Sequence, residues 1–145
     1  MIEINNLTTN QVDENFLKKV AEKVLAKENK KRNLSIALVG PGRIRELNKK
    51  YRGKNRATDV LAFETNSKFQ IPNSKIKNLG EIIICLKEVK NNAKRYKSTF
   101  EKELARVLIH GVLHLLGYDH EISEEKAKKM EERQDYYLSE ILKSR

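Results

Sequence analysis

All three histidines of the chain, His110, His114 and His120, lie within eleven positions. His110 and His114 are four residues apart, and a helix brings residues at that spacing onto one face. Gly117 suits the left-handed position that ends a helix, so the chain can turn and bring His120 back beside the other two. Three neutral imidazoles in this arrangement match the ligands of catalytic zinc, whose fourth position holds a water. The spacing therefore predicts a metal centre with an open coordination position.

The three histidines also allow two other interpretations. Each could be a core residue satisfied by one hydrogen bond, but this requires three independent coincidences in one short segment. A structural zinc is the stronger alternative, although structural sites usually have four Cys or His ligands. Beyond the histidines the chain offers only Cys85, and its place in an apolar run favours a core position rather than a fourth ligand.

The residues before the histidines have the pattern of a buried helix. Residues 100–116 are apolar on nearly every side, which predicts a helix inside the protein. Ser98 is the expected N-cap, with Glu101 three residues later as its capping-box partner.

The other elements predict a single α+β domain over residues 1–145, with a small mixed sheet of about four strands packed with several helices and a zincin-like metal-binding helix. The expected strands are residues 2–5, 34–39, 60–63 and 79–86. The expected helices are residues 12–28, the segment after Gly40-Pro41-Gly42, and residues 87–96, 100–116 and 123–142. In the second helix Ile44, Leu47 and Tyr51 should face inward, and residues 65–78 should form a mobile loop.

The net charge of +10 is unevenly distributed along the chain. Residues 43–56 contain seven Lys or Arg against one acid, and residues 87–102 contain six against two. Residues 124–145, in contrast, balance six acids with six bases. A local basic excess is what a phosphate-binding face requires, although lysine-rich surfaces also arise simply as solvated faces.

The composition favours a cytoplasmic protein without a membrane association. Of the 145 residues 39% are hydrophobic, which is typical of a globular domain. The N-terminus lacks a basic region followed by an apolar stretch, and no segment is long enough to span a bilayer. A single cysteine excludes an internal disulfide.

The histidine spacing also matches the zinc signature of metzincin peptidases, including the glycine at position 117. Gly111, however, stands where a peptidase has its glutamate, the general base of peptide hydrolysis. A metallopeptidase is therefore disfavoured.

Three segments together closely resemble the YbeY family of bacterial rRNA maturation factors. They are YRGKNRATDVLAF at 51–63, GEIIIC at 80–85 and HGVLHLLGYDH at 110–120. The similarity extends over essentially the whole chain. It implies a zincin-like fold and a zinc-dependent, single-strand-specific endoribonuclease acting in 16S rRNA 3′-end maturation and ribosome quality control. The implied partners are single-stranded RNA, the small ribosomal subunit and ribosomal proteins.

The resemblance also implies roles for particular residues. His110, His114 and His120 match the metal ligands of the family, and Arg52 matches its arginine implicated in RNA handling or catalysis. Residues 58–61 match its Thr-Asp/Asn-Val-Leu segment, and Ala62 stands where serine is common.

From these residues we hypothesise that Zn²⁺ engages the scissile phosphate while Arg52 stabilises charge on its oxygens. Lys54 and Arg56 of the same basic loop are expected to bind RNA. Asp119 either orients a histidine or braces the turn. Tyr118 is expected to be a packing residue, and three imidazoles also suit Ni²⁺ or copper. A non-catalytic assembly factor with a structural zinc remains the alternative function.

Overall fold

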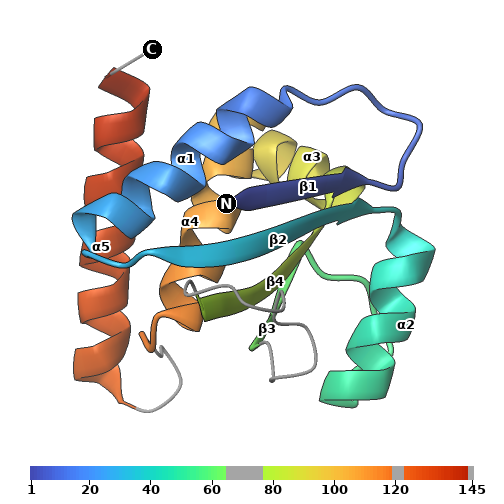
Figure 1. Ribbon diagram of the computed structural model, residues 1–145. Helices are drawn as coiled ribbons and strands as arrows, with labels where there is room; N and C mark the ends of the chain where they lie inside the picture. Colours follow the sequence, from blue (N-terminus) through green and yellow to red (C-terminus); the bar gives the residue numbers. More distant parts are fainter. Residues whose placement is uncertain (65–76, 119–122, 144–145) are drawn as a thin grey trace.

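The chain forms a four-stranded mixed sheet with the order β1-β2-β4-β3 (Figure 1). The structure is a computed structural model that describes residues 1–64, 77–118 and 123–143. The three strands β1, β2 and β4 are parallel, and β3 pairs antiparallel with β4 at the edge. In chain order the elements are β1 (Ile2–Asn6), α1 (Glu14–Lys27), β2 (Arg32–Val39), α2 (Pro41–Arg52), β3 (Val60–Glu64), β4 (Lys77–Cys85), α3 (Leu86–Arg95), α4 (Phe100–Leu115) and α5 (Glu124–Lys143). The predicted α+β class is confirmed.

Helices cover the two faces of the sheet unequally (Figure 1). The larger core contains buried side chains of α1, α3, α4 and α5 together with one face of the sheet. The smaller core lies on the opposite face, where Ile44 of α2 packs against β2, β3 and β4. The alternation along β4 separates the two cores, because successive strand residues point to opposite faces. Ile82 and Ile84 join the larger core, while Ile83 and Cys85 join the smaller one.

The helix α4 is buried along most of its length, as its apolar composition predicts. Its N-cap is Thr99, whose hydroxyl accepts a hydrogen bond from the Lys102 main-chain nitrogen at 3.1 Å. The prediction of Ser98 as N-cap is therefore wrong by one residue. Thr99 has the extended backbone of an N-cap and directly precedes the first helical residue. After the helix, Gly117 has a φ of 102°, in agreement with the left-handed conformation expected at the helix end.

Two further expectations are wrong in detail. The strand β4 already begins at Lys77, because Lys77 and Asn78 pair with the start of β2, so these two residues are not part of a loop. The rest of the predicted loop, residues 65–76, lies outside the described residues. Tyr51 does not face inward: it is 54% exposed and packs its ring at an edge-to-face angle against Phe63.

Gly80 permits an irregularity in β4. Leu34 pairs with Gly80 while Asn33 pairs with Asn78, so Leu79 is an extra residue on β4. Gly80 has a φ of 158°, and an added Cβ would lie 2.3 Å from the main-chain oxygen of Phe63. Only glycine allows this close approach of β3 to β4.

None of the helices within the described ranges combines the length and the apolar composition of a membrane-spanning segment.

Candidate active site

A pocket of about 580 Å³ lies where α2, β3 and α4 meet. Arg52, at the end of α2, lines it on one side, and His110 and His114 of α4 line it on another. Lys54 and Arg56, from the loop between α2 and β3, also reach it. The fold thus brings two predicted metal ligands and all three predicted RNA-binding residues to one pocket. Cys85 does not line this pocket and is fully buried in the smaller core, which confirms its expected core position.

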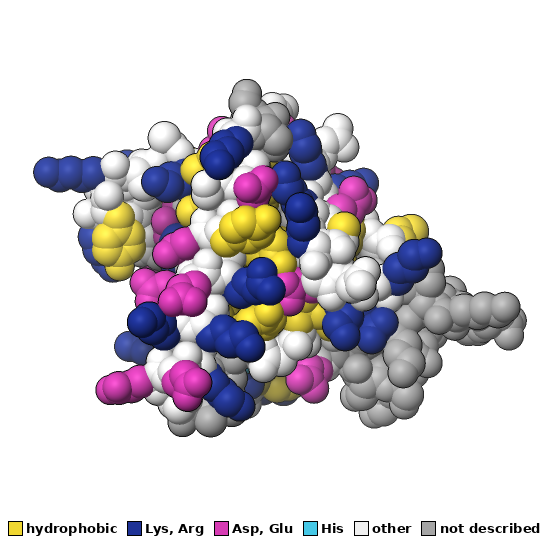
Figure 2. All heavy atoms as spheres, turned by 90° about the vertical axis from the view of Figure 1, so that its left-hand side faces the viewer, with side chains coloured by type: hydrophobic (Ala, Val, Ile, Leu, Met, Phe, Trp, Pro, Cys, Tyr) yellow, Lys and Arg dark blue, Asp and Glu magenta, His cyan; other side chains and the backbone are white. Residues whose placement is uncertain are grey.

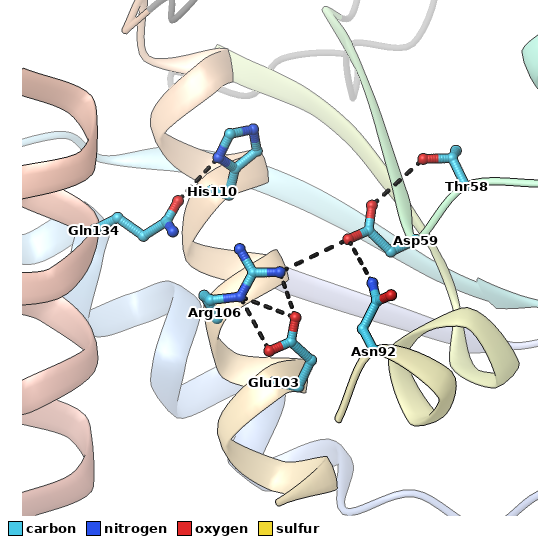
Figure 3. A network of polar contacts seen from close by, with 7 residues as sticks. All are labelled: Thr58, Asp59, Asn92, Glu103, Arg106, His110 and Gln134. Atoms are coloured by element: carbon cyan, nitrogen blue, oxygen red, sulfur yellow. Dashed lines mark hydrogen bonds and ion pairs between the residues drawn. The ribbon is translucent and has the colours of Figure 1, made fainter. Parts of the chain in front are cut away.

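His110 and His114 lie one helical turn apart on α4 and are both partly buried. The imidazole Nδ1 of His110 is 2.9 Å from the side-chain oxygen of Gln134, a buried residue of α5 (Figure 3). An amide oxygen can only accept a hydrogen bond, so a hydrogen bond here requires the proton on Nδ1, which leaves the lone pair of a neutral imidazole on Nε2. This is the tautomer that a histidine needs to bind a metal through Nε2.

His120 and Asp119 lie outside the described residues, so their predicted roles stay predictions. Within the described ranges, which omit residues 119–122, no group of three or more His, Cys, Asp or Glu is arranged to hold a metal. The pair His110 and His114 nevertheless fits zinc chemically. Two imidazoles face one pocket from successive turns of a helix, and one of them is oriented by a buried amide.

Arg52 is held at the pocket by two contacts with β3. Its Nη2 donates a hydrogen bond to the main-chain oxygen of Ala62 at 2.9 Å, and its Cζ lies 5.1 Å from the centroid of the Phe63 ring. In the part of the chain that the structure describes, no carboxylate pairs with Arg52. The guanidinium is therefore positioned without being neutralised, which is the state required to bind a phosphate.

The loop that carries Lys54 and Arg56 is tied to α2. The buried side chain of Asn48 donates to the main-chain oxygen of Arg56 at 2.9 Å, and Arg45 donates to the side chain of Asn55 at 2.8 Å. Both cations are exposed. Their backbone is thus fixed beside the pocket while their side chains remain in solvent.

Sequence reasoning missed an arginine on the histidine face of α4. Arg106 lies one turn before His110 and lines the same pocket. Its Nε lies 2.9 and 3.1 Å from the two carboxylate oxygens of Glu103, which is only 3% exposed. The hydrogen bond with Glu103 raises the pKa of Arg106, so the arginine stays charged. The signal was present in the sequence, because positions 106, 110 and 114 are spaced by four residues.

Arg106 also connects α4 to the start of β3 (Figure 3). Its Nη2 lies 3.9 Å from the Asp59 carboxylate, which accepts hydrogen bonds from Asn92 of α3 at 3.3 Å and from Thr58 at 3.4 Å. This network explains why polar residues occupy 58 and 59 in the segment that precedes β3. It fixes the wall of the pocket relative to the histidine helix.

Gly111 has a packing role. An added Cβ would lie 3.1 Å from Cγ2 and 3.2 Å from Cδ1 of Ile82, which is fully buried in β4. A glutamate at this position, as in a metzincin peptidase, would bring its Cβ into this close contact with Ile82 in the larger core. The close contact between α4 and β4 supports the interpretation that this helix does not carry the peptidase base.

Tyr118 is a packing residue, as expected. It packs against the larger core, and its hydroxyl donates to the Glu28 carboxylate at 2.8 Å.

The sequence profile described as "Endoribonuclease YbeY" matches residues 3–142. The chain belongs to the endoribonuclease YbeY family. The matched range contains the three segments at 51–63, 80–85 and 110–120. Endoribonuclease YbeY of Thermotoga neapolitana is 42% identical over 129 residues, which cover 87% of this chain and 80% of the relative. Endoribonuclease YbeY of Petrotoga mobilis is 39% identical over 144 residues, with 98% and 95% covered.

The fold is also similar to a solved structure. A solution structure of a Thermotoga maritima protein is 36% identical and superposes with a TM-score of 0.69, covering 99% of this chain and 91% of the other. This YbeY family chain thus shares its arrangement of sheet and helices with a relative whose structure was determined in solution.

Proposed function

We propose that this YbeY family protein is a zinc-dependent, single-strand-specific endoribonuclease that acts in 16S rRNA 3′-end maturation and ribosome quality control. The observation that supports it is the pocket in which His110 and His114 face Arg52, Lys54 and Arg56. Cations at the rim attract the RNA backbone, and imidazoles on the wall are suited to a metal. The names of its relatives add support, because they are endoribonucleases.

In this proposal the histidines and Arg52 have separate roles. His110 and His114 hold the metal from α4, with His120 as the proposed third ligand. Zinc bound there supplies a Lewis acid and lowers the pKa of a water to about 7. Arg52, oriented by Ala62 and Phe63, binds the non-bridging oxygens of the scissile phosphate and stabilises the charge that develops on them.

Lys54 and Arg56 bind neighbouring phosphates and orient the strand across the pocket. A single strand can bend to bring a phosphate into a concave site between two helices and a strand edge. An A-form duplex holds its phosphates on a stiff helix, which disfavours entry and supports single-strand specificity. The same surface would bind the rRNA of the small ribosomal subunit, with ribosomal proteins as further partners.

The second candidate function is that of a protein that binds the metal but does not cleave RNA. In a non-catalytic assembly factor, zinc would only brace the turn after α4, and the basic loop would bind rRNA or a ribosomal protein. The positioned, unneutralised guanidinium of Arg52 favours the enzyme, because a structural zinc does not require it. Ni²⁺ is a second candidate for the metal, since imidazoles accept both ions.

Cleavage of end-labelled RNA by purified protein tests the proposal. Wild type and His114→Ala are compared on a single strand and on the same strand annealed to its complement, after circular dichroism shows that both proteins are folded. We expect the wild type to cut the single strand only, zinc to restore activity after chelation, and the variant to be inactive.

Equal cleavage by both proteins would place the activity elsewhere and contradict the proposal. A folded, zinc-loaded wild type that binds RNA without cutting it would favour the assembly factor.

A further inference from the structure

We infer that Gln134 is a positioning residue for the metal centre: it holds the neutral His110 imidazole in the tautomer that presents Nε2 to the metal. The inference rests on the proposed function of this pocket as a metal site. It adds a residue of α5, far from the histidines in the sequence, to the apparatus of the site.

The contact between the two side chains is partly buried and involves one buried amide. The Gln134 oxygen lies 2.9 Å from His110 Nδ1, and Gln134 is only 8% exposed although it lies on a helix with many charged residues (Figure 3). A buried amide costs free energy unless its polar atoms are hydrogen-bonded. In the part of the chain that the structure describes, His110 is the partner found for its oxygen.

The hydrogen bond has a chemical consequence for His110. A neutral imidazole carries one proton, on Nδ1 or on Nε2, and in water the Nε2–H form is the more common. The Gln134 oxygen accepts only from an Nδ1–H, so the contact selects the other form and keeps the lone pair on Nε2. Partners of this kind on metal-bound histidines typically change metal affinity by about 10- to 100-fold.

The packing on either side of Gln134 holds the backbone that carries its amide. Gln134 lies between Met130 and Leu138 on α5, successive turns whose side chains are buried in the larger core with α4. The amide therefore reaches His110 from a backbone that is held by buried neighbours.

The experiment uses two variants of similar side-chain length. Gln134→Met removes the acceptor and keeps the bulk, whereas Gln134→Glu keeps an acceptor for Nδ1–H. Long-range ¹H–¹⁵N correlation spectra of metal-free, ¹⁵N-histidine-labelled protein at pH 8.5 report the tautomer, with His110 assigned by its absence in His110→Asn. Zinc affinity is measured by competition with a chelating dye.

We expect the Nδ1–H form of His110 in the wild type and in Gln134→Glu, and the Nε2–H form in Gln134→Met. Zinc affinity should fall about 10- to 100-fold in Gln134→Met alone. Ile141→Ala is the structural control: Ile141 is buried in the larger core at the end of α5, about two turns from Gln134, so the change should lower the melting temperature and leave both readouts unchanged.

An unchanged His110 tautomer in Gln134→Met, or an equal loss of affinity in Ile141→Ala, would overturn the inference. The tautomer is measured without metal or RNA, so it tests Gln134 separately from the proposed function. A wild type that does not bind zinc would refute the proposed metal site and, with it, this role of Gln134.

Discussion

Arg52 illustrates how much one residue depends on its surroundings. Its guanidinium uses one nitrogen for the Ala62 oxygen and lies over the Phe63 ring, so its remaining N–H groups can be directed at a phosphate. Lysine keeps the charge but lacks the planar fork. We expect Arg52→Lys to lower the cleavage rate by at least about tenfold, in single-turnover assays, with a smaller effect on RNA affinity.

Arg43→Lys is the matched control, because Arg43 is an exposed arginine of the same helix that does not line the pocket. Undiminished cleavage by Arg52→Lys would remove the role assigned to Arg52.

Cys85 allows a test of the open metal position. Burial raises the pKa of its thiol and the side chain faces the smaller core, on the opposite side of β4 from the histidine helix. We expect Cys85→Ala to retain the zinc content of the wild type, measured by atomic absorption, and the native thiol to react with Ellman's reagent only after denaturation. A folded Cys85→Ala that loses zinc would make Cys85 a ligand.

The pairing of α4 with β4 depends on Gly111. A Cβ at this position meets three carbons of the buried Ile82. Alanine would gain about 1 kcal/mol in helix propensity, but overpacking of a core typically costs about 1–3 kcal/mol. We expect Gly111→Ala to lower the free energy of unfolding, measured by urea denaturation.

Two controls separate the packing cost from helix propensity. Gly42→Ala in α2 meets no atom within 4 Å and should be neutral or stabilising. In an Ile82→Ala background the cost of Gly111→Ala should disappear. If the cost persists there, Ile82 is not its cause.

One carboxylate connects three helices. Glu28, at the end of α1, accepts hydrogen bonds from Tyr118, after α4, and from Tyr137 of α5. Its Oε2 also lies 3.9 Å from the Nε of Arg133. Burial, followed by the hydrogen bond to Glu28, raises the pKa of Tyr137 above its ordinary range. An unfolded tyrosine ionises near pH 10, so above about pH 10 the folded state binds more protons than the unfolded state.

Stability should therefore fall as the pH rises above about 10. We expect a shallower fall in Tyr137→Phe, measured as the free energy of unfolding in urea between pH 8 and 11. At neutral pH this variant should lose about 1.5–3 kcal/mol, because a hydrogen bond to a charged group is removed. Tyr136→Phe, at an exposed neighbour, should retain the wild-type slope; identical slopes in all three proteins would contradict this explanation.

At the scale of the whole molecule, the net charge of +10 is not spread evenly. Figure 2 shows the side on which α5 lies, where acidic and basic side chains are interspersed. The pocket, in contrast, is lined by four arginine or lysine residues and a single carboxylate, Asp59. This difference predicts that RNA lies across the pocket and not along α5.

The salt dependence of RNA binding tests this orientation. Each phosphate contact on a single strand contributes about −0.7 to the slope of log K against log salt concentration. We expect Lys54→Ala to reduce the magnitude of the slope by about 0.7, in fluorescence anisotropy titrations. Lys126→Ala, at an exposed position of α5, should have no effect. The reverse result would place the RNA on the α5 side.

Much of this protein was determined by patterns among residues close together in the sequence. The apolar side chains on nearly every side of residues 100–116 predicted the buried helix. The four-residue spacing placed His110 and His114 on one face of it. The periodicity of burial and the spacing along a helix depend on residues a few positions apart. Both can therefore be predicted from the sequence without knowledge of the tertiary structure. The error at Ser98 arose because Ser98 and Thr99 are both good N-caps, whereas the main-chain nitrogen of Ser98 donates to Ala93 at 2.8 Å at the end of α3.

Contacts between distant segments were decided only by the tertiary structure. The meeting of Arg52 with the histidines requires β3 to lie at the edge of the sheet, so that α2 and α4, from opposite faces, reach one pocket. No local pattern marks Gln134 as the partner of His110, or Glu28 as the acceptor for Tyr118 and Tyr137. These pairs form because burial of the apolar faces of α1, α4 and α5 in one core brings their polar side chains within hydrogen-bonding distance.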